Sequence, residues 1–248
     1  MNTWWPYARL AAAVLGLAAI IRQFSLSMAN AAAADTPWAS HIPTVTVNFF
    51  SYFTILSNLI AAIVLIIAGV WMLRTKGSTK PEPAWLATLL VCVSTYMIVT
   101  GIVYNLLLRH IAIAGISDVW TNETLHVIIP LFLLADVLFA PRRRALPWGT
   151  MLTAAVFPIV WVAYTLIRAN FIIGPAHGNH YWYPYPFLDP NIQGGYGGVV
   201  GYIIGIAVAI IGVAALVVWV GRRRGIRSPG LSDPIFESGT AQRASSLE

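Results

Sequence analysis

The chain has 248 residues, of which 58% are hydrophobic and only 10% are charged, and its mean hydropathy is +0.73. A soluble domain carries about 25% charged residues, so this sequence lacks the polar surface that water requires. Apolar runs of about 20 residues, the length that crosses the hydrocarbon core of a bilayer, fill most of the chain and leave no room for a separate soluble domain. The composition therefore excludes a soluble protein and predicts an all-α, polytopic membrane protein.

Six apolar runs predict a six-transmembrane-helix bundle. The first run is too long for the apolar region of a signal peptide and has no clear small-residue cleavage site, so we expect it to be retained as a span. Residues 1–227 form the predicted transmembrane domain, and residues 228–248 are a polar tail that is expected to be disordered. The predicted spans cover residues 7–30, 47–73, 84–109, 123–140, 147–169 and 197–220.

Connections rich in Lys and Arg alternate with connections that are poor in them. Basic residues occur at 74–80, 142–144 and 222–224, whereas residues 170–196 contain neither Lys nor Arg. The positive-inside rule places the basic connections and both termini in the cytoplasm, and we expect the protein to lie in the plasma membrane. The same rule explains the net charge of +6 better than a nucleic-acid partner does, so we predict no binding to nucleic acid.

Several remaining residue types have structural interpretations. Pro130 and Pro158 lie within predicted spans and are expected to kink them. Cys92 is the single cysteine, can form no internal disulfide and is expected to be a small packed residue. His177 and His180 have the spacing of metal ligands, but their Gly/Pro-rich loop offers no clear further ligand, so we predict neither a metal nor a cofactor. The segment 180–190 is rich in Tyr and Trp, which favour a membrane interface. We therefore expect it to fold over the outer mouth of the bundle.

Polar residues recur on one side of the second predicted span. Asn48, Ser51, Thr54 and Asn58 share one face of a continuous helix. Four polar groups facing lipid would be costly, so that face is expected to point into the bundle. His126 lies about one turn inside the outer end of the fourth span, and at 1.5 Å per residue it is within one or two turns of the depth of Thr54.

Other polar residues are predicted at a similar depth. Arg22 in the first span needs a partner, and Glu123, one turn from His126, is the nearest carboxylate, so we expect the two to form a structural or functional ion pair. We predict a hydrated polar cavity that binds an amphiphile, with its polar group among these residues and its chains between the helices. The remaining candidates for this cavity are Tyr104, Asn105 and Arg109 on the third span and Tyr164 and Arg168 on the fifth.

Thr54 and His126 are a candidate nucleophile and base. A Thr hydroxyl is a poor nucleophile until a base accepts its proton, and a neutral imidazole suits that task near pH 7. The pair could attack an ester carbonyl, form an acyl-threonine and release it to water. Glu123 is a candidate for orienting the imidazole. The candidate donors to the oxyanion are Asn48, Asn58, Arg22 and a backbone N–H.

Structural interpretations of the same residues remain open. A Thr in a transmembrane helix usually bonds its own backbone carbonyl. The alternatives are a non-enzymatic lipid-binding protein or transporter that uses the same cavity, and a structural membrane protein with a hydrated core. The sequence does not predict an oligomeric state.

Two segments carry a family resemblance: Phe50–Asn58, which reads FSYFTILSN, and Asn122–Pro130, which reads NETLHVIIP. Together with the aromatic segment Tyr183–Phe187, they resemble the prokaryotic six-helix relatives of the androgen-induced membrane hydrolases, a group that includes the androgen-dependent regulator of tissue factor pathway inhibitor. The resemblance implies a threonine hydrolase that acts on fatty acid esters of hydroxy fatty acids. It also implies that Thr54 is the nucleophile and His126 the base, with a lipid substrate that enters from the bilayer.

Overall fold

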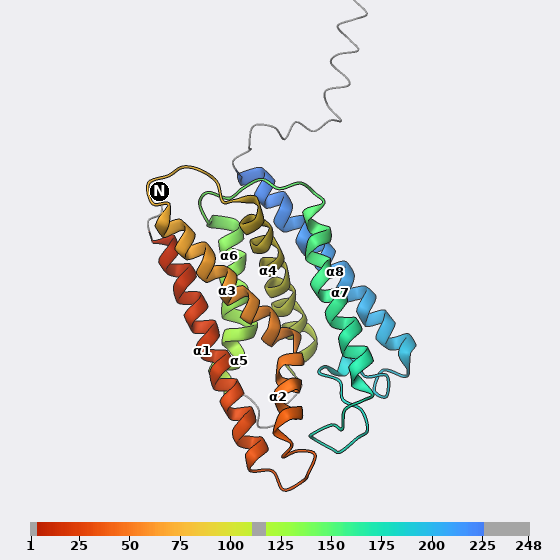
Figure 1. The fold of residues 1–248 in the computed structure, drawn as a ribbon. Coiled ribbons are helices and arrows are strands. Elements are labelled where there is room, and N and C mark those ends of the chain that lie inside the picture. Colours follow the sequence, from red (N-terminus) through yellow and green to blue (C-terminus); the bar gives the residue numbers. More distant parts are fainter. Residues whose placement is uncertain (1–3, 111–117, 226–248) are drawn as a thin grey trace, which may run out of the picture.

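The computed structural model describes residues 4–110 and 118–225, which form an all-α bundle without β-strands in that part of the chain (Figure 1). The predicted tail at 228–248 lies outside the described residues. Within the described ranges, six helical segments are long and apolar enough to cross a membrane, which confirms the predicted fold class. These segments are Trp5–Ala32, Phe53–Arg74, Ala84–Leu108, Val119–Phe139, Thr150–Ala169 and Tyr196–Arg224.

The bundle begins with α1 (Trp5–Ala32), α2 (Ile42–Ser51) and α3 (Phe53–Arg74). The prediction of one continuous helix over 47–73 is wrong, because Tyr52 is extended (φ −69°, ψ 128°) and separates α2 from α3. The Tyr52 ring packs edge-on against Trp182 and Tyr185, each at 5.7 Å between ring centroids. Contacts with a distant segment of the chain thus accompany the break, and α3 begins inside the bundle.

Two π-helical turns interrupt the next two spans. The third span consists of α4 (Ala84–Val103) and η1 (Tyr104–Leu108). The fourth consists of α5 (Val119–Glu123), η2 (Thr124–Ile128) and α6 (Ile129–Phe139), so it begins four residues before the predicted 123. Pro130 explains the second π turn, because a proline ring in a regular α-helix collides with the carbonyl four residues earlier, here that of His126. The wider turn relieves this collision.

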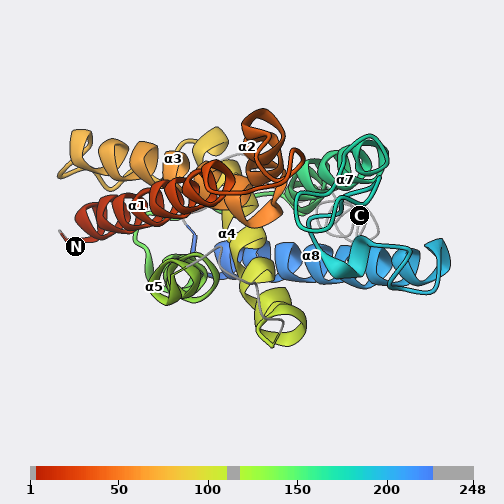
Figure 2. The same cartoon turned by 90° about the horizontal axis from the view of Figure 1, so that it is seen from below.

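The last two spans are α7 (Thr150–Ala169) and α8 (Tyr196–Arg224), and the short 3₁₀ helix η3 (Pro186–Leu188) lies in the connection between them. Helix α4 occupies the centre of the bundle, where it packs against α3, α6, α7 and α8 (Figure 2). Helix α1 packs along α3, while α7 and α8 pair with each other on the other side of α4. Cys92 is buried in α4, as predicted.

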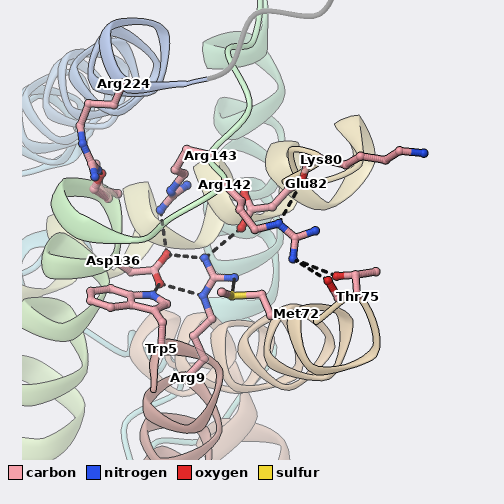
Figure 3. A network of polar contacts seen from close by, with 11 residues as sticks. Trp5, Arg9, Met72, Thr75, Lys80, Glu82, Asp136, Arg142, Arg143 and Arg224 are labelled. Atoms are coloured by element: carbon pink, nitrogen blue, oxygen red, sulfur yellow. Dashed lines mark hydrogen bonds and ion pairs between the residues drawn. The ribbon is translucent and has the colours of Figure 1, made fainter. Parts of the chain in front are cut away.

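Four charged side chains form a buried charge network at the end of the bundle where α1 begins and α8 ends (Figure 3). Arg9 contacts Asp136 at 2.8 Å and Glu82 at 3.0 Å, and Arg143 contacts the second oxygen of Asp136 at 2.8 Å. Trp5 donates a further hydrogen bond of 2.7 Å to Asp136. Because two positive and two negative groups are present, the network is balanced in charge and joins α1 and α6 to the connections beside them.

The two ends of the bundle differ in chemistry. The Arg9 end holds the buried charge network and the connections that are rich in Lys and Arg, and both termini of the described bundle lie there (Figure 1). The opposite end, called the Thr54 end below, holds the start of α3, both π turns and residues 170–195. The candidate residues from the sequence therefore gather at one end.

Candidate functional site

Thr54 lies in the first turn of α3, directly after the break at Tyr52. The first N–H groups of a helix have no partner within the helix. The Thr54 N–H donates instead to the Tyr185 hydroxyl at 3.2 Å. The side chain is only 8% exposed. The break therefore places the buried Thr54 hydroxyl beside N–H groups that have no partner within the helix. A continuous helix would not provide such groups at this position.

His126 is the direct neighbour of Thr54. The Thr54 Oγ1 and the His126 Nε2 are 3.2 Å apart, and the His126 Nδ1 lies 2.9 Å from the backbone carbonyl of Asn122. A carbonyl can only accept, so Nδ1 carries the hydrogen and Nε2 of the neutral ring accepts. The Thr54 hydroxyl therefore donates to Nε2. The expected proximity of the two side chains is confirmed, and the tautomer is the one that a base facing Thr54 requires.

The imidazole of His126 is held on several sides. The Tyr104 ring stacks on it with centroids 4.1 Å apart and planes at 22°, and the side chain of Asn122 donates to the Tyr104 hydroxyl. Helix α4 approaches closely at Gly101, where a Cβ would lie 3.0 Å from the Pro130 Cβ and 3.3 Å from the His126 carbonyl oxygen. Both π turns contribute to this arrangement, since Tyr104 begins η1 and His126 is the middle residue of η2.

Tyr185 completes the arrangement and was not among the residues selected from the sequence. Its hydroxyl is 3.2 Å from Thr54 Oγ1, and the ring is buried against Phe187, which stacks on it at 5.1 Å. Because the Thr54 hydroxyl donates to His126, the Tyr185 hydroxyl is the donor to Thr54 Oγ1. Hydrogen bonds therefore run in one direction from Tyr185 through Thr54 and His126 to Asn122. Tyr185 lies in the aromatic segment Tyr183–Phe187, which supported the family resemblance and predicted a covering segment rather than a contact with Thr54.

Asn58 contacts backbone and not the Thr54 hydroxyl. Its amide nitrogen donates to the Thr54 carbonyl at 2.9 Å and to the Leu125 carbonyl at 3.2 Å. Both amide hydrogens are thus engaged with backbone carbonyls, and the role of Asn58 as an oxyanion donor stays a prediction. The second of these hydrogen bonds joins α3 to η2, the elements that carry Thr54 and His126.

A second polar cluster joins α2 to α7. Arg168 donates to the Asn48 side chain at 2.7 Å, and the Ser51 and Tyr164 hydroxyls are 3.0 Å apart. Asn48 and Ser51 are buried, as predicted, but they do not share a face with Thr54. The helical wheel assumed a continuous helix, and the extended residue at the α2–α3 junction changes the direction of the side chains.

The predicted ion pair between Arg22 and Glu123 is wrong. Arg22 contacts Asp118 at 2.7 Å, and Glu123 contacts Arg109 at 3.0 Å, with all four side chains between 34% and 48% exposed. Arg109 also donates to Asn105 at 2.8 Å. Asp118 precedes α5 on the side of α1, whereas Glu123 faces η1. Glu123 therefore does not orient His126, and the backbone carbonyl of Asn122 takes that place.

A cavity of about 220 Å³ lies beside Thr54, between α4, α7 and α8. Its wall is apolar, and none of its lining side chains is charged. The side chains that bring a hydroxyl or an indole N–H to the wall are Thr54, Thr100, Tyr104, Trp161 and Tyr185. The predicted polar cavity is therefore wrong in character, because the polar candidates bond to one another in the clusters described above. Thr54 and Tyr104 are the predicted residues that line it.

The chain matches no protein-family model, no curated protein and no solved structure. The family resemblance of the two motifs thus stays a hypothesis. A hydroxyl that donates to a neutral imidazole is the arrangement of an activated nucleophile. Here that arrangement opens on an apolar cavity inside a membrane bundle.

Proposed function

We propose that this protein is an integral membrane lipid-ester hydrolase in which Thr54 is the nucleophile and His126 is the general base. The proposal rests on the 3.2 Å contact between the Thr54 Oγ1 and the His126 Nε2. It is supported by the Asn122 carbonyl, which keeps the hydrogen on the other ring nitrogen. These contacts correspond to those of a catalytic triad, in which a nucleophile donates to a base and the base donates to an acceptor. Here a backbone carbonyl stands in place of the carboxylate acceptor.

The reaction proceeds in two halves. The Thr54 oxygen attacks the ester carbonyl carbon while its proton passes to the His126 Nε2, which forms a tetrahedral intermediate. Collapse of this intermediate breaks the bond to the alcohol oxygen, which takes the proton from His126 and leaves. Water then attacks the acyl-threonine, again giving its proton to His126, and the fatty acid is released as the Thr54 hydroxyl is restored.

The oxyanion of each intermediate needs hydrogen-bond donors. The Tyr185 hydroxyl lies 3.2 Å from both the Thr54 Oγ1 and the Thr54 N–H. The hydroxyl can rotate to donate to a substrate oxygen beside Thr54, and this releases the fixed Thr54 N–H to donate to the same oxygen. Tyrosine hydroxyls and backbone N–H groups are recurrent donors in such sites. Of the donors considered from the sequence, the proposal keeps a backbone N–H, that of Thr54, and adds Tyr185.

The substrate class follows from the surroundings of the site. An apolar cavity without charged groups suits the hydrocarbon part of a long-chain ester. The resemblance to the androgen-induced membrane hydrolases narrows this proposal to fatty acid esters of hydroxy fatty acids. In the same proposal the protein lies in the plasma membrane with its basic Arg9 end in the cytoplasm, so that the site serves the outer leaflet.

Hydrolysis by purified variants tests the proposal. The parent protein in detergent is given a panel of long-chain acyl esters and a fluorophosphonate probe. Thr54→Ala and His126→Ala are expected to abolish hydrolysis and labelling, and Tyr185→Phe is expected to lower kcat by about 10²–10³. Matched controls are Thr95→Ala, which removes a buried hydroxyl bonded to its own helix, and His41→Ala, which removes an exposed imidazole. Both controls should retain parental activity.

Two outcomes would refute the proposal that the protein is a hydrolase. One is a parent protein that hydrolyses no ester in the panel, and the other is full activity in both the Thr54 and the His126 variants. Reconstituted vesicles then identify the alternative function, since a transporter moves the ester across the membrane unchanged.

A further inference from the structure

The cavity beside Thr54 is elongated along α8, and it is called the tube below. Its lining residues on α8 are Ile203, Ile206, Ala207, Ile210 and Ile211, which recur at helical spacing on one face. Faces of α7 and α4 with the same spacing line the other sides of the tube. From Ile203 to Ile211 the wall extends for eight residues, or about 12 Å at 1.5 Å per residue.

Reactive groups lie at one end of this tube and a packed floor lies at the other. Tyr185, Phe187 and Leu188 pack with Ile203 at one end, and Thr54 contacts Tyr185 there. One turn beyond the opposite end, α4, α7 and α8 close together around Tyr96, Ala154 and Ala214, all of them buried. The small side chains of Ala154 and Ala214, both 0% exposed, allow this close packing. A chain that enters from Thr54 therefore meets a floor.

The tube is open along one side. Ile159 on α7 lines the cavity and is nevertheless 63% exposed on the outer surface of the bundle, and Ala207 on α8 is exposed as well. In a membrane this surface faces lipid. A hydrocarbon chain can thus enter between α7 and α8 without passing through water.

The geometry points to an acyl-chain binding site. We infer that the tube holds the acyl chain of the ester, with its carbonyl at Thr54 and its methyl end at the floor, and that the floor limits the length of chain accepted. This inference rests on the proposed hydrolysis for its orientation, but the binding of a hydrocarbon chain can be measured separately.

Filling the deep end of the tube tests the inference. Ala155 lines the cavity near the floor, so Ala155→Phe shortens the tube, whereas its neighbour Val156 is 57% exposed on the outer surface and Val156→Phe is the matched control. For p-nitrophenyl decanoate relative to p-nitrophenyl butyrate, Ala155→Phe is expected to lower the kcat/KM ratio by about tenfold or more, equivalent to two excluded methylene groups. The butyrate rate should stay within about twofold of the parent, and Val156→Phe should leave the ratio unchanged.

Ile211→Ala gives the opposite test, because it removes side-chain volume at the floor. It is expected to raise the kcat/KM of p-nitrophenyl dodecanoate relative to p-nitrophenyl butyrate, and it remains informative if Ala155→Phe fails to fold. Equal effects of Ala155→Phe on both esters, or no change of the ratio with either variant, would overturn the inference while leaving the hydrolase intact.

A binding measurement separates the two proposals. The Thr54→Ala variant is titrated with decanoic acid in a calorimeter, with and without Ala155→Phe or Val156→Phe. Weaker binding with Ala155→Phe alone supports the acyl-chain site even where the parent protein hydrolyses nothing, in which case only the enzymatic proposal fails. Unchanged binding in all variants overturns the acyl-chain site.

Discussion

Replacing Asp136 by asparagine should destabilise the bundle strongly. Asp136 is 0% exposed and accepts hydrogen bonds from Trp5 at 2.7 Å, from Arg9 at 2.8 and 3.0 Å, and from Arg143 at 2.8 Å (Figure 3). The substitution Asp136→Asn removes the negative charge and turns one acceptor into an NH₂ group that faces guanidinium donors. Arg9 then keeps Glu82 as its partner in the network, and Arg143 loses its contact with a carboxylate.

The magnitude follows from the burial of these groups. Removing one partner from a buried ion pair costs about 3–5 kcal/mol, because the remaining charge is left uncompensated away from water. The ion pair between Arg22 and Asp118 is the internal comparison, since its side chains are 48% and 35% exposed. Such a pair contributes about 0–1 kcal/mol, so Asp118→Asn should cost far less than Asp136→Asn.

Reversible unfolding in mixed micelles measures both variants. The parent, Asp136→Asn and Asp118→Asn are titrated with dodecyl sulfate while tryptophan fluorescence is followed, and the free energies of unfolding are compared. Equal losses for the two variants would refute the reasoning, because burial would then make no difference. Hydrolysis per folded molecule should change little in Asp136→Asn, since the network lies at the opposite end of the bundle from Thr54.

Two further substitutions test the support of the candidate site. Gly101→Ala places a Cβ 3.0 Å from the Pro130 Cβ and should displace η2, lowering kcat for ester hydrolysis by about tenfold to a hundredfold; Gly212→Ala, which meets no atom within 4 Å, should stay within about twofold of the parent. Asn58→Leu leaves the Leu125 carbonyl without its side-chain donor and the Thr54 carbonyl with only that of Ser57, and it should lower the free energy of unfolding by about 1–3 kcal/mol in the dodecyl sulfate titration. An unchanged Gly101→Ala rate, or an unchanged stability of Asn58→Leu, would contradict the respective contact.

The sequence predicts the six spans and the proximity of Thr54 and His126 because both depend on simple periodic quantities. Hydrophobic length sets the number of spans, and the rise per residue sets the depth of each side chain. The contact between Thr54 and His126 at 3.2 Å follows from these depths and from the neighbouring helices. Their rotation about the helix axes is set by packing, which periodicity does not describe.

The break at Tyr52 could not be predicted from local sequence. No Gly or Pro marks it, and its ring is held by Trp182 and Tyr185, which lie more than a hundred residues later in the chain. The same reason explains why Tyr185 was missed, since a loop residue can be placed only once the loop conformation is known. Helix propensity and hydrophobic patterns depend on residues that are close in the sequence. The site depends on contacts between residues that are far apart in the sequence.

The buried charge network had a detectable signal. Asp136 lies among apolar residues within the predicted fourth span, and Arg9 lies near the start of the first. An ionisable residue inside a span calls for a partner, and the two residues lie at the same end of their antiparallel spans. The sequence therefore contained enough information to propose this pair, although Glu82 and Arg143 lie in connections whose course only the structure shows.

The start of α3 has an electrostatic consequence for the candidate site. Aligned peptide dipoles give a helix roughly half a positive elementary charge at its first turn, and Thr54 lies in that turn. In a continuous helix over 47–73 the same residue would lie in mid-helix, where neighbouring peptide dipoles cancel. The extended backbone at Tyr52 separates the positive pole of α3 from the negative pole of α2, which ends at Ser51, and Thr54 lies on the α3 side among the unpaired N–H groups of the first turn. Negative charge that develops on an oxygen bound to Thr54 would be stabilised by the 22-residue helix behind it.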